Sequence, residues 1–128
     1  MFEHSRKLEK VRVYRYGGEE FLILFANENR KTVIDFLTDL RLDIEKTPIQ
    51  HDTTSICITI SIGLAFSAYN DSVATFVERA DMAVYQAKEN GRNRLEIGIE
   101  NATMVEYVAE ELPSPVREEP KLTMGFVL

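Results

Sequence analysis

Residues 11–25 contain two candidate strands joined by a pair of glycines, and this arrangement restricts the fold more than any other part of the chain. The segments 11–17 and 19–25 are rich in strand-forming residues, and Gly17-Gly18 tolerates the positive φ angles of a tight turn. The second segment contains the run FLILF (residues 21–25), which is apolar at every position. Such a run is typical of a strand covered on both faces. We therefore expect a hairpin inside a sheet, with helices on at least one side.

The segment 28–46 has helical periodicity. Its apolar stripe consists of Val33, Phe36, Leu37, Leu40 and Ile44. Asn27 and Asn29 are the candidate N-caps, and Pro48 indicates where the helix stops. This pattern predicts one amphipathic helix after the hairpin.

A second helix is predicted over 72–89. Its stripe consists of Val73, Phe76, Val77, Ala80, Val84 and Ala87. Asp71 or Ser72 can cap its start, and Gly91 suits the position just past its end.

The segment 55–66 alternates strictly between large apolar and small residues. Ile56, Ile58, Ile60, Ile62 and Leu64 share one face, and Cys57, Thr59, Ser61 and Gly63 share the other. This period of two predicts one continuous strand, in which Cys57 is a small packed residue. The small face allows either close packing or the close approach of a ligand. A polar loop is expected over 49–55 and a short strand over 94–99.

The expected order is strand, strand, helix, strand, helix, strand, which indicates an α+β fold of the two-layer sandwich type. We expect residues 1–99 to form the domain and residues 100–128 to form a tail. The part 100–120 is acidic and contains three prolines, with room for one short helix near 101–111. The tail then ends in the apolar sequence KLTMGFVL (121–128).

Composition excludes several classes of protein. The 128 residues carry 15 basic and 21 acidic side chains, a net charge of -6. This balance argues against a general nucleic-acid or anionic-membrane surface, but it leaves room for a local basic pocket that binds a phosphorylated small molecule. A single cysteine cannot form an internal disulfide, which favours a reducing compartment. With no apolar run of membrane-spanning length and no signal peptide, the expected location is the cytoplasm.

Two carboxylates follow the glycine pair, and they allow two interpretations. Glu19 and Glu20 are either solvated acids on an exposed hairpin or ligands for a hard cation such as Mg²⁺. A second carboxylate beside a cation can also accept a proton from a hydroxyl nucleophile. Gly17 and Gly18 would then let a substrate lie directly against the backbone.

Two cations lie around the predicted end of the second helix. Lys88 and Arg92 either complement the helix dipole or form a phosphate clamp, with lysine as a point charge and arginine as a fork. Tyr14, Tyr16 and Tyr85 are interpreted as packing groups rather than stacking platforms.

Three motifs together resemble the GGDEF family of bacterial diguanylate cyclases. They are RYGGEEF (15–21), TISIGLA (59–65) and RADMAVYQAKENGRNR (79–94), and they stand in the order and approximate spacing of that family. The resemblance covers roughly residues 11–97. Glutamate at the third position of the first motif is an accepted variant of the family's aspartate.

The resemblance implies a fold like the ferredoxin-like palm of nucleotide polymerases and class III cyclases. It implies condensation of two GTP molecules into cyclic di-GMP for signal transduction, with Mg²⁺ or Mn²⁺ as cofactor and the active site formed between two GGDEF domains. By motif position, Gly17 and Gly18 would line the nucleotide, and Glu20 would bind metal. Glu19 would be a metal ligand or catalytic base. Lys88 and Arg92 would bind phosphates, and a sensory or regulatory domain would lie upstream.

The chain departs from the family in its first residues. The family's domain has an earlier strand that ends in a second metal-binding aspartate, and a helical segment whose Asn and Asp hold guanine. Residues 1–10 supply neither, and the inhibitory RxxD motif would fall at 8–11, where the sequence reads LEKV. We therefore expect the carboxyl-terminal portion of a cyclase domain that is inactive as this chain. The alternative is a degenerate nucleotide-binding or dimerisation/regulatory module without catalysis.

The absent first strand is central in the family's sheet. It lies between the strand at 21–25 and the last strand of the ferredoxin-like core, so its loss leaves two unpaired edges. One hypothesis is that the segment 121–128, from this chain or a neighbour, fills the place. The other is that the segment covers a different apolar surface.

Overall fold

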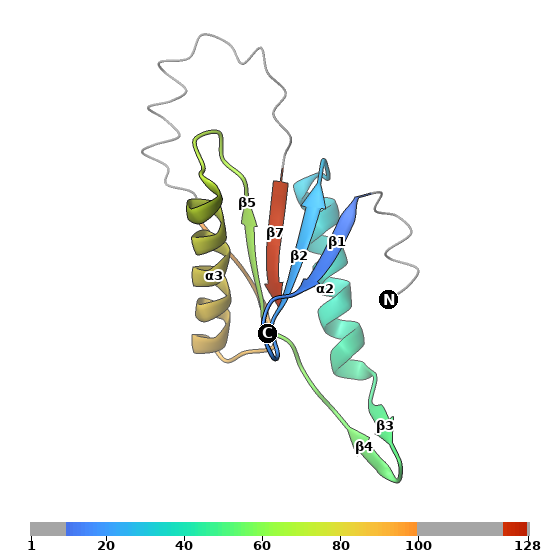
Figure 1. The fold of residues 1–128 in the computed structure, drawn as a ribbon. Helices are drawn as coiled ribbons and strands as arrows, with labels where there is room; N and C mark the ends of the chain where they lie inside the picture. The colour runs from blue at the N-terminus through green and yellow to red at the C-terminus, as the bar shows by residue number, and fades with distance from the viewer. Residues whose placement is uncertain (1–9, 100–121, 128) are drawn as a thin grey trace.

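The computed structural model describes residues 10–99 and 122–127, which form a sheet, two helices and a small separate hairpin (Figure 1). The elements in chain order are β1 (Val11–Arg15), β2 (Phe21–Ala26), α2 (Arg30–Lys46), β3 (Ile49–His51), β4 (Thr54–Ile56), β5 (Ile62–Phe66), α3 (Val73–Glu89), β6 (Leu95–Ile97) and β7 (Leu122–Val127). The predicted order of six elements is therefore incomplete, because it lacks the β3–β4 hairpin and β7.

The five strands of the main sheet follow the order β1-β2-β7-β5-β6. β7 is antiparallel to both of its neighbours, while β5 and β6 are parallel. β2 and β5 therefore run in the same direction, are connected through α2, and hold a strand of opposite direction between them. This split β-α-β arrangement is characteristic of ferredoxin-like folds.

β7 fills the centre of the sheet. Val127 is paired with Phe21 of β2 on one side and with Ile62 of β5 on the other. The hypothesis that the apolar carboxyl-terminal segment takes the central place is thus confirmed for residues 122–127, and the strand comes from the same chain. The helix predicted near 101–111 lies outside the described residues.

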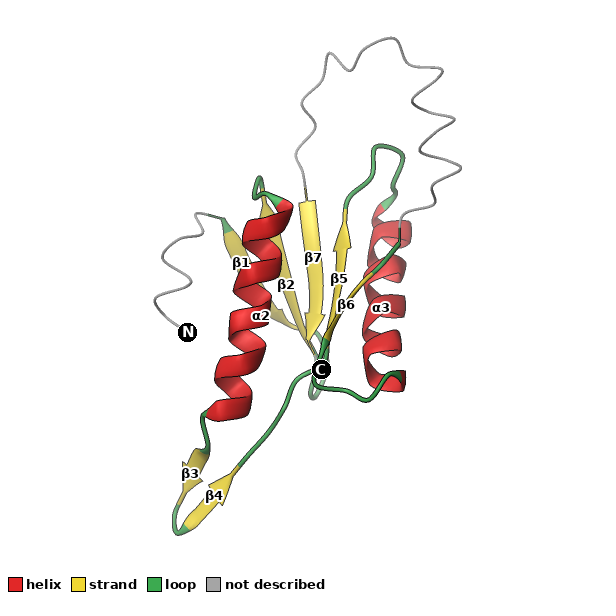
Figure 2. Cartoon of the chain, turned by 180° about the vertical axis from the view of Figure 1, so that it is seen from behind, coloured by secondary structure: helices red, strands yellow, loops and turns green. Residues whose placement is uncertain are grey.

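The two helices cover opposite faces of the sheet (Figures 1 and 2). α2 covers the larger core, whose fully buried members include Phe25, Val33, Leu37, Ile62 and Leu64. α3 covers a smaller cluster, formed by Ala65, Phe76, Ala80 and Val84. The molecule therefore has three layers, and the prediction of a two-layer sandwich is wrong: alternate residues of β5 face different helices.

Coverage of β2 decreases toward its start. Ile23 and Phe25 are buried beneath α2, and Leu22 and Leu24 are half-buried against the cluster under α3. Phe21 is 42% exposed. The expectation of a strand covered on both faces therefore holds along its middle and not at its first residue.

The helix ends are close to their predicted positions because local capping determines them. Asn29 is the N-cap of α2 and accepts a hydrogen bond from the Thr32 amide at 2.8 Å. Ser72 caps α3 in a reciprocal capping box with Thr75. Gly91 follows the end of α3 with a φ of 115°, as expected of a residue past a helix C-terminus.

The prediction of one continuous strand over 55–66 is wrong. β4 ends at Ile56, β5 begins at Ile62, and the residues between them form neither strand nor helix. β4 pairs with β3 in a hairpin that projects beyond the sheet, so the predicted polar loop at 49–55 is also wrong (Figure 1). Cys57 is exposed rather than packed. A sequence that alternates between apolar and small residues predicts which side chains share a face. It does not predict which of those residues pair with a neighbouring strand.

The small face of β5 serves the packing of α3. A Cβ atom added to Gly63 would lie 2.2 Å from the Val84 amide nitrogen and 2.5 Å from the Ala80 carbonyl oxygen. Glycine thus lets the helix backbone approach the strand directly. Of the two possibilities left open by the sequence, close packing is the one found.

Candidate functional site

The glycine-containing turn between β1 and β2 is closed by three hydrogen bonds. The amides of Tyr16 and Gly17 both donate to the Glu20 carbonyl oxygen, at 2.8 and 3.3 Å. The Arg15 guanidinium donates to the Gly18 carbonyl oxygen at 2.9 Å. These bonds fix the backbone from which Glu19 and Glu20 project.

Gly17 and Gly18 do not adopt positive φ angles, and their structural role lies in the space left by the absent side chain. Among the described glycines only Gly91 has a positive φ, so the angular role expected for Gly17 and Gly18 is wrong. A Cβ atom on Gly17 would lie 3.2 Å from a carboxylate oxygen of Glu20, which places that carboxylate over the glycine. A Cβ atom on Gly18 would meet nothing within 4 Å. The fold itself leaves the space above Gly18 open.

The hairpin offers a small set of oxygen ligands. Glu19 is exposed and Glu20 is half-buried. In the described parts of the chain, no three His, Cys, Asp or Glu side chains come together as a metal-binding group. Mg²⁺ commonly takes one or two carboxylates and completes its shell with water and substrate phosphates. Glu19 and Glu20 could supply at most two such carboxylates, and water or a phosphorylated ligand would have to complete the shell.

The two predicted phosphate ligands lie on either side of the end of α3. Lys88 is in the last turn of the helix and is half-buried. The Arg92 amide donates to the Ala87 carbonyl oxygen at 2.9 Å, and the Gly91 amide to that of Lys88 at 3.4 Å. This pair of bonds is a Schellman motif, which reverses the chain after the helix. Arg92 is exposed, with a φ of 62°.

The sheet register brings both sets of residues to the same end of the sheet. Phe21 at the start of β2 is paired with Val127, Val127 with Ile62, and Ile62 with Leu95 at the start of β6. The hairpin carboxylates precede Phe21, and the loop with Arg92 precedes Leu95. Residues separated by about seventy positions in the sequence thus border one end of the sheet.

A polar cluster that the sequence analysis missed supports this loop. Arg41 donates to the side-chain oxygen of Asn93 at 2.8 Å and forms an ion pair with Glu45 at 3.2 Å. The Asn93 side-chain amide donates to Glu45 at 2.8 Å, and its backbone amide donates to the Ser61 hydroxyl at 3.3 Å. The sequence feature that could have indicated this cluster is Asn93, two residues after Gly91. Asparagine tolerates left-handed backbone angles, so it is suited to a loop that reverses the chain after a helix.

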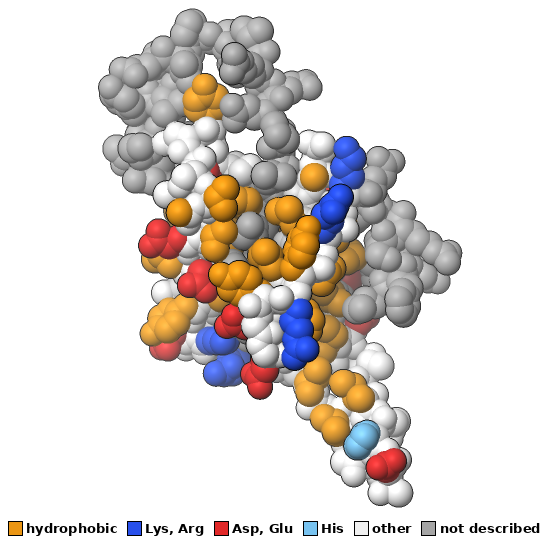
Figure 3. Space-filling view, in the orientation of Figure 1, with side chains coloured by type: hydrophobic (Ala, Val, Ile, Leu, Met, Phe, Trp, Pro, Cys, Tyr) orange, Lys and Arg blue, Asp and Glu red, His pale blue; other side chains and the backbone are white. Residues whose placement is uncertain are grey.

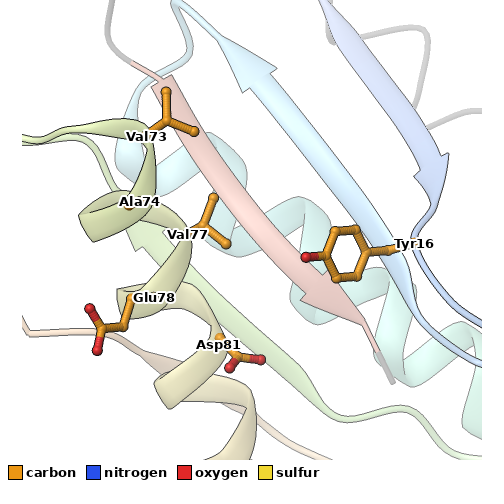
Figure 4. Close-up of a pocket in the computed structure, with 6 residues that line it drawn as sticks. All are labelled: Tyr16, Val73, Ala74, Val77, Glu78 and Asp81. Carbon is orange, nitrogen blue, oxygen red and sulfur yellow. The ribbon is translucent and has the colours of Figure 1, made fainter.

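A groove of about 630 Å³ lies between the hairpin and α3 (Figure 4). Its lining is mostly apolar and includes the two carboxylates of Glu78 and Asp81. The other lining residues are Tyr16, Val73, Ala74 and Val77. Apolar side chains gather in the centre of this face of the molecule (Figure 3). Tyr14, Tyr16 and Tyr85 are 46%, 60% and 62% exposed, so these three residues, expected to be packing groups, lie at the surface.

No helix within residues 10–99 or 122–127 is long and apolar enough to cross a lipid bilayer.

Comparison with known proteins identifies the family. The family model described as "Diguanylate cyclase, GGDEF domain" matches residues 5–94. Diguanylate cyclase A of Treponema denticola is 40% identical over 90 residues, which are 68% of this chain and 24% of that protein. Diguanylate cyclase DgcM of Escherichia coli is 35% identical over 83 residues, 65% of this chain and 20% of that protein. The chain therefore spans about a quarter or less of these relatives.

A solved structure is similar throughout most of the chain. It is the GGDEF domain of DgcB from Caulobacter crescentus in complex with c-di-GMP, with a TM-score of 0.67 and 31% identity. The match covers 75% of this chain and 57% of that one. With the hairpin and the α3 loop at one end of the sheet and a family match across both, this chain belongs to the GGDEF family of diguanylate cyclase domains.

Proposed function

We propose that the chain carries the GTP site of a diguanylate cyclase, in which two GTP molecules condense to cyclic di-GMP and release pyrophosphate. The observation that carries the proposal is the sheet register, which sets Glu19 and Glu20 at the same end of the sheet as the loop with Arg92. Paired carboxylates and phosphate-binding cations are the groups that phosphoryl transfer needs.

Each residue has a proposed role. Glu20 and Glu19 would hold Mg²⁺ or Mn²⁺, which supplies charge stabilisation for the triphosphate and the attacking hydroxyl. Glu19 would accept the proton of the 3′-hydroxyl as its oxygen attacks the α-phosphorus of the second GTP. Gly17 and Gly18 would line the nucleotide, and the open space above Gly18 supports this role.

Lys88 and Arg92 would bind the phosphates. Lysine provides a point charge, and the planar guanidinium of arginine provides a two-pronged donor that matches phosphate oxygens. Arg92 is exposed beyond the end of α3, where it can reach a ligand.

The proposed reaction requires two copies of the site, because each GTP provides both a hydroxyl nucleophile and an α-phosphate. A second GGDEF domain, in the simplest case a homodimer of this chain, would present the second nucleotide. We place this activity in the bacterial cytoplasm, within residues 1–99 and under the control of a sensory or regulatory domain upstream.

A second function is favoured by the small number of carboxylates. In the described residues no group of three metal-binding side chains is present. β7, which takes the central place in the sheet, reads LTMGFV and contains no Asp or Glu. Two-metal catalysis by Glu19 and Glu20 alone is therefore difficult. The alternative is a module without turnover that binds nucleotide, or that mediates dimerisation or regulation.

One experiment separates these functions. The purified chain is titrated with GTP and Mg²⁺ by calorimetry, and the same mixture is assayed for cyclic di-GMP and pyrophosphate. Binding with product supports the cyclase, and binding without product supports the module. Glu20→Gln should weaken only the Mg²⁺-dependent part of the affinity, because the side chain keeps its shape and loses its charge. Absence of GTP binding by the unaltered chain would reject the cyclase and the nucleotide-binding form of the module.

A further inference from the structure

The loop that carries Arg92 has an unusual backbone. Gly91, Arg92 and Asn93 follow α3 with φ angles of 115°, 62° and 47°. Positive φ is ordinary for glycine and accessible to asparagine, but it is unfavourable for arginine because Cβ approaches the following carbonyl oxygen. Such a conformation persists only where surrounding contacts hold it. The Arg92 backbone is held by the hydrogen bond to Ala87 and by one from Arg94 Nε to its carbonyl oxygen at 3.3 Å.

Asn93, the next residue, is fixed by contacts of its own. Arg41 donates to its side-chain oxygen at 2.8 Å and to its carbonyl oxygen at 3.3 Å. Its side-chain amide donates to Glu45 at 2.8 Å, and its backbone amide donates to Ser61, which is 2% exposed. Asn93 therefore has polar contacts from both its backbone and its side chain.

The chemistry of this cluster requires an amide at position 93. The residue must accept a hydrogen bond from a guanidinium and donate one to a carboxylate, and asparagine does both with a single short side chain. Aspartate would place a second carboxylate against Glu45 and would lose the donor. The ion pair between Arg41 and Glu45 already balances the charges on α2, so a neutral residue completes the cluster.

We propose that Asn93 is a positioning residue for phosphate binding: by anchoring the loop to α2, it holds Arg92 in the left-handed conformation from which its guanidinium would bind phosphate together with Lys88. This inference rests on the proposed function for the phosphate role of Arg92. The anchoring itself depends only on the geometry of the loop. Asn93 is bonded to two residues of α2 and to Ser61, which directly precedes β5, so the anchor is attached to the two elements that form most of the larger core.

The test compares Asn93→Ala, Asn93→Asp and Asn93→Gly in the full chain, with Asp71→Asn as a matched control. The control breaks a different side-chain cluster, between Asp71 and Arg79, and leaves the loop after α3 intact. Two quantities are measured: the affinity for GTP with Mg²⁺, and the NMR intraresidue amide–Hα cross-peak of Arg92, which is strong when φ is positive.

We expect Asn93→Ala and Asn93→Asp to weaken GTP binding by about tenfold, the equivalent of one charge-assisted hydrogen bond, and to reduce the Arg92 cross-peak. Asn93→Gly should give an intermediate loss, because glycine accepts the backbone angle but lacks the side-chain contacts. The control should lower stability and leave both quantities unchanged.

An unchanged cross-peak in Asn93→Ala would overturn the anchoring. A reduced cross-peak with unchanged GTP affinity would overturn the role in phosphate binding. If the unaltered chain binds no GTP, the proposed function fails, and the cross-peak still decides whether Asn93 determines the conformation of Arg92.

Discussion

Arg79 binds Asp71 with both terminal nitrogens of its guanidinium, at 2.9 Å from Nη1 to Oδ1 and 2.5 Å from Nη2 to Oδ2. The same guanidinium donates to the Phe66 carbonyl oxygen at 2.6 Å, and the Ala68 amide donates to Asp71 at 2.7 Å. The pair thus ties the end of β5 to the start of α3. Its side chains are only 14% and 11% exposed, so water screens the interaction weakly.

This pair predicts a loss of stability in acid. Hydrogen bonds from Arg79 lower the pKa of Asp71 from 3.8 to about 2. A carboxyl with a lowered pKa in the folded state contributes stability that is present above its unfolded value and disappears as pH falls toward the folded value. The unfolding free energy should therefore decrease by about 2 kcal/mol between pH 5 and pH 2 on account of this group. Urea denaturation of the wild type and Asp71→Asn at both pH values measures it. A difference between the two proteins that does not shrink in acid would contradict the assignment.

Two glycine substitutions should have opposite consequences. Gly63→Ala places a Cβ atom 2.2 Å from the Val84 backbone, which must move, so we expect destabilisation of about 2–3 kcal/mol or more. Gly18→Ala meets no atom within 4 Å and should leave the unfolding free energy nearly unchanged. If Gly18 lines a nucleotide, this second variant should still bind GTP more weakly. Thermal denaturation and calorimetry of both variants distinguish a glycine that serves packing from one that serves a ligand.

Removing either cation of the proposed clamp should weaken GTP binding. Lys88→Ala and Arg92→Ala each delete a charged phosphate donor, and each should reduce the affinity by about tenfold. Lys31→Ala is the matched control: Lys31 is 85% exposed on α2, paired with Asp35, and should have no effect on binding. Equal affinities of all three variants would show that the cations at the end of α3 only complement the helix dipole.

The central position of β7 makes it sensitive to proline. With β2 on one side and β5 on the other, backbone amides along β7 point to a neighbouring strand. Thr123→Pro removes one such donor and should destabilise the fold by about 3 kcal/mol or more. Thr123→Val keeps the amide and favours a strand, so it should be tolerated. Similar unfolding midpoints for the two variants would indicate that β7 does not stabilise the sheet.

Local patterns predicted those parts of the fold that depend on local interactions. The helices at 28–46 and 72–89 were found at Arg30–Lys46 and Val73–Glu89, because helical periodicity and caps such as Asn29 act within a few residues. The strands flanking the glycine pair were predicted for the same reason. The three-layer arrangement was not predicted, because the face of the sheet that each helix covers depends on contacts between segments distant in sequence.

The candidate site was predicted only in part. Its residue types follow from the sequence motifs, and the sheet register accounts for their placement at one end. The anchor formed by Asn93, Arg41 and Ser61 joins residues 32 and 52 positions apart, which no local pattern reports. Periodicity likewise predicted one strand over 55–66, although only Ile62–Phe66 joins the main sheet.

The place of β7 also determines when this molecule can fold during synthesis. Phe21 is paired with Val127, so the sheet cannot close before residues 122–127 have left the ribosome. Until then β2 and β5 expose unpaired edges, which are the surfaces that chaperones protect and that promote aggregation. Folding of the sheet therefore requires residues 122–127 to be synthesised first, and pairing across such a long sequence separation should make it slow.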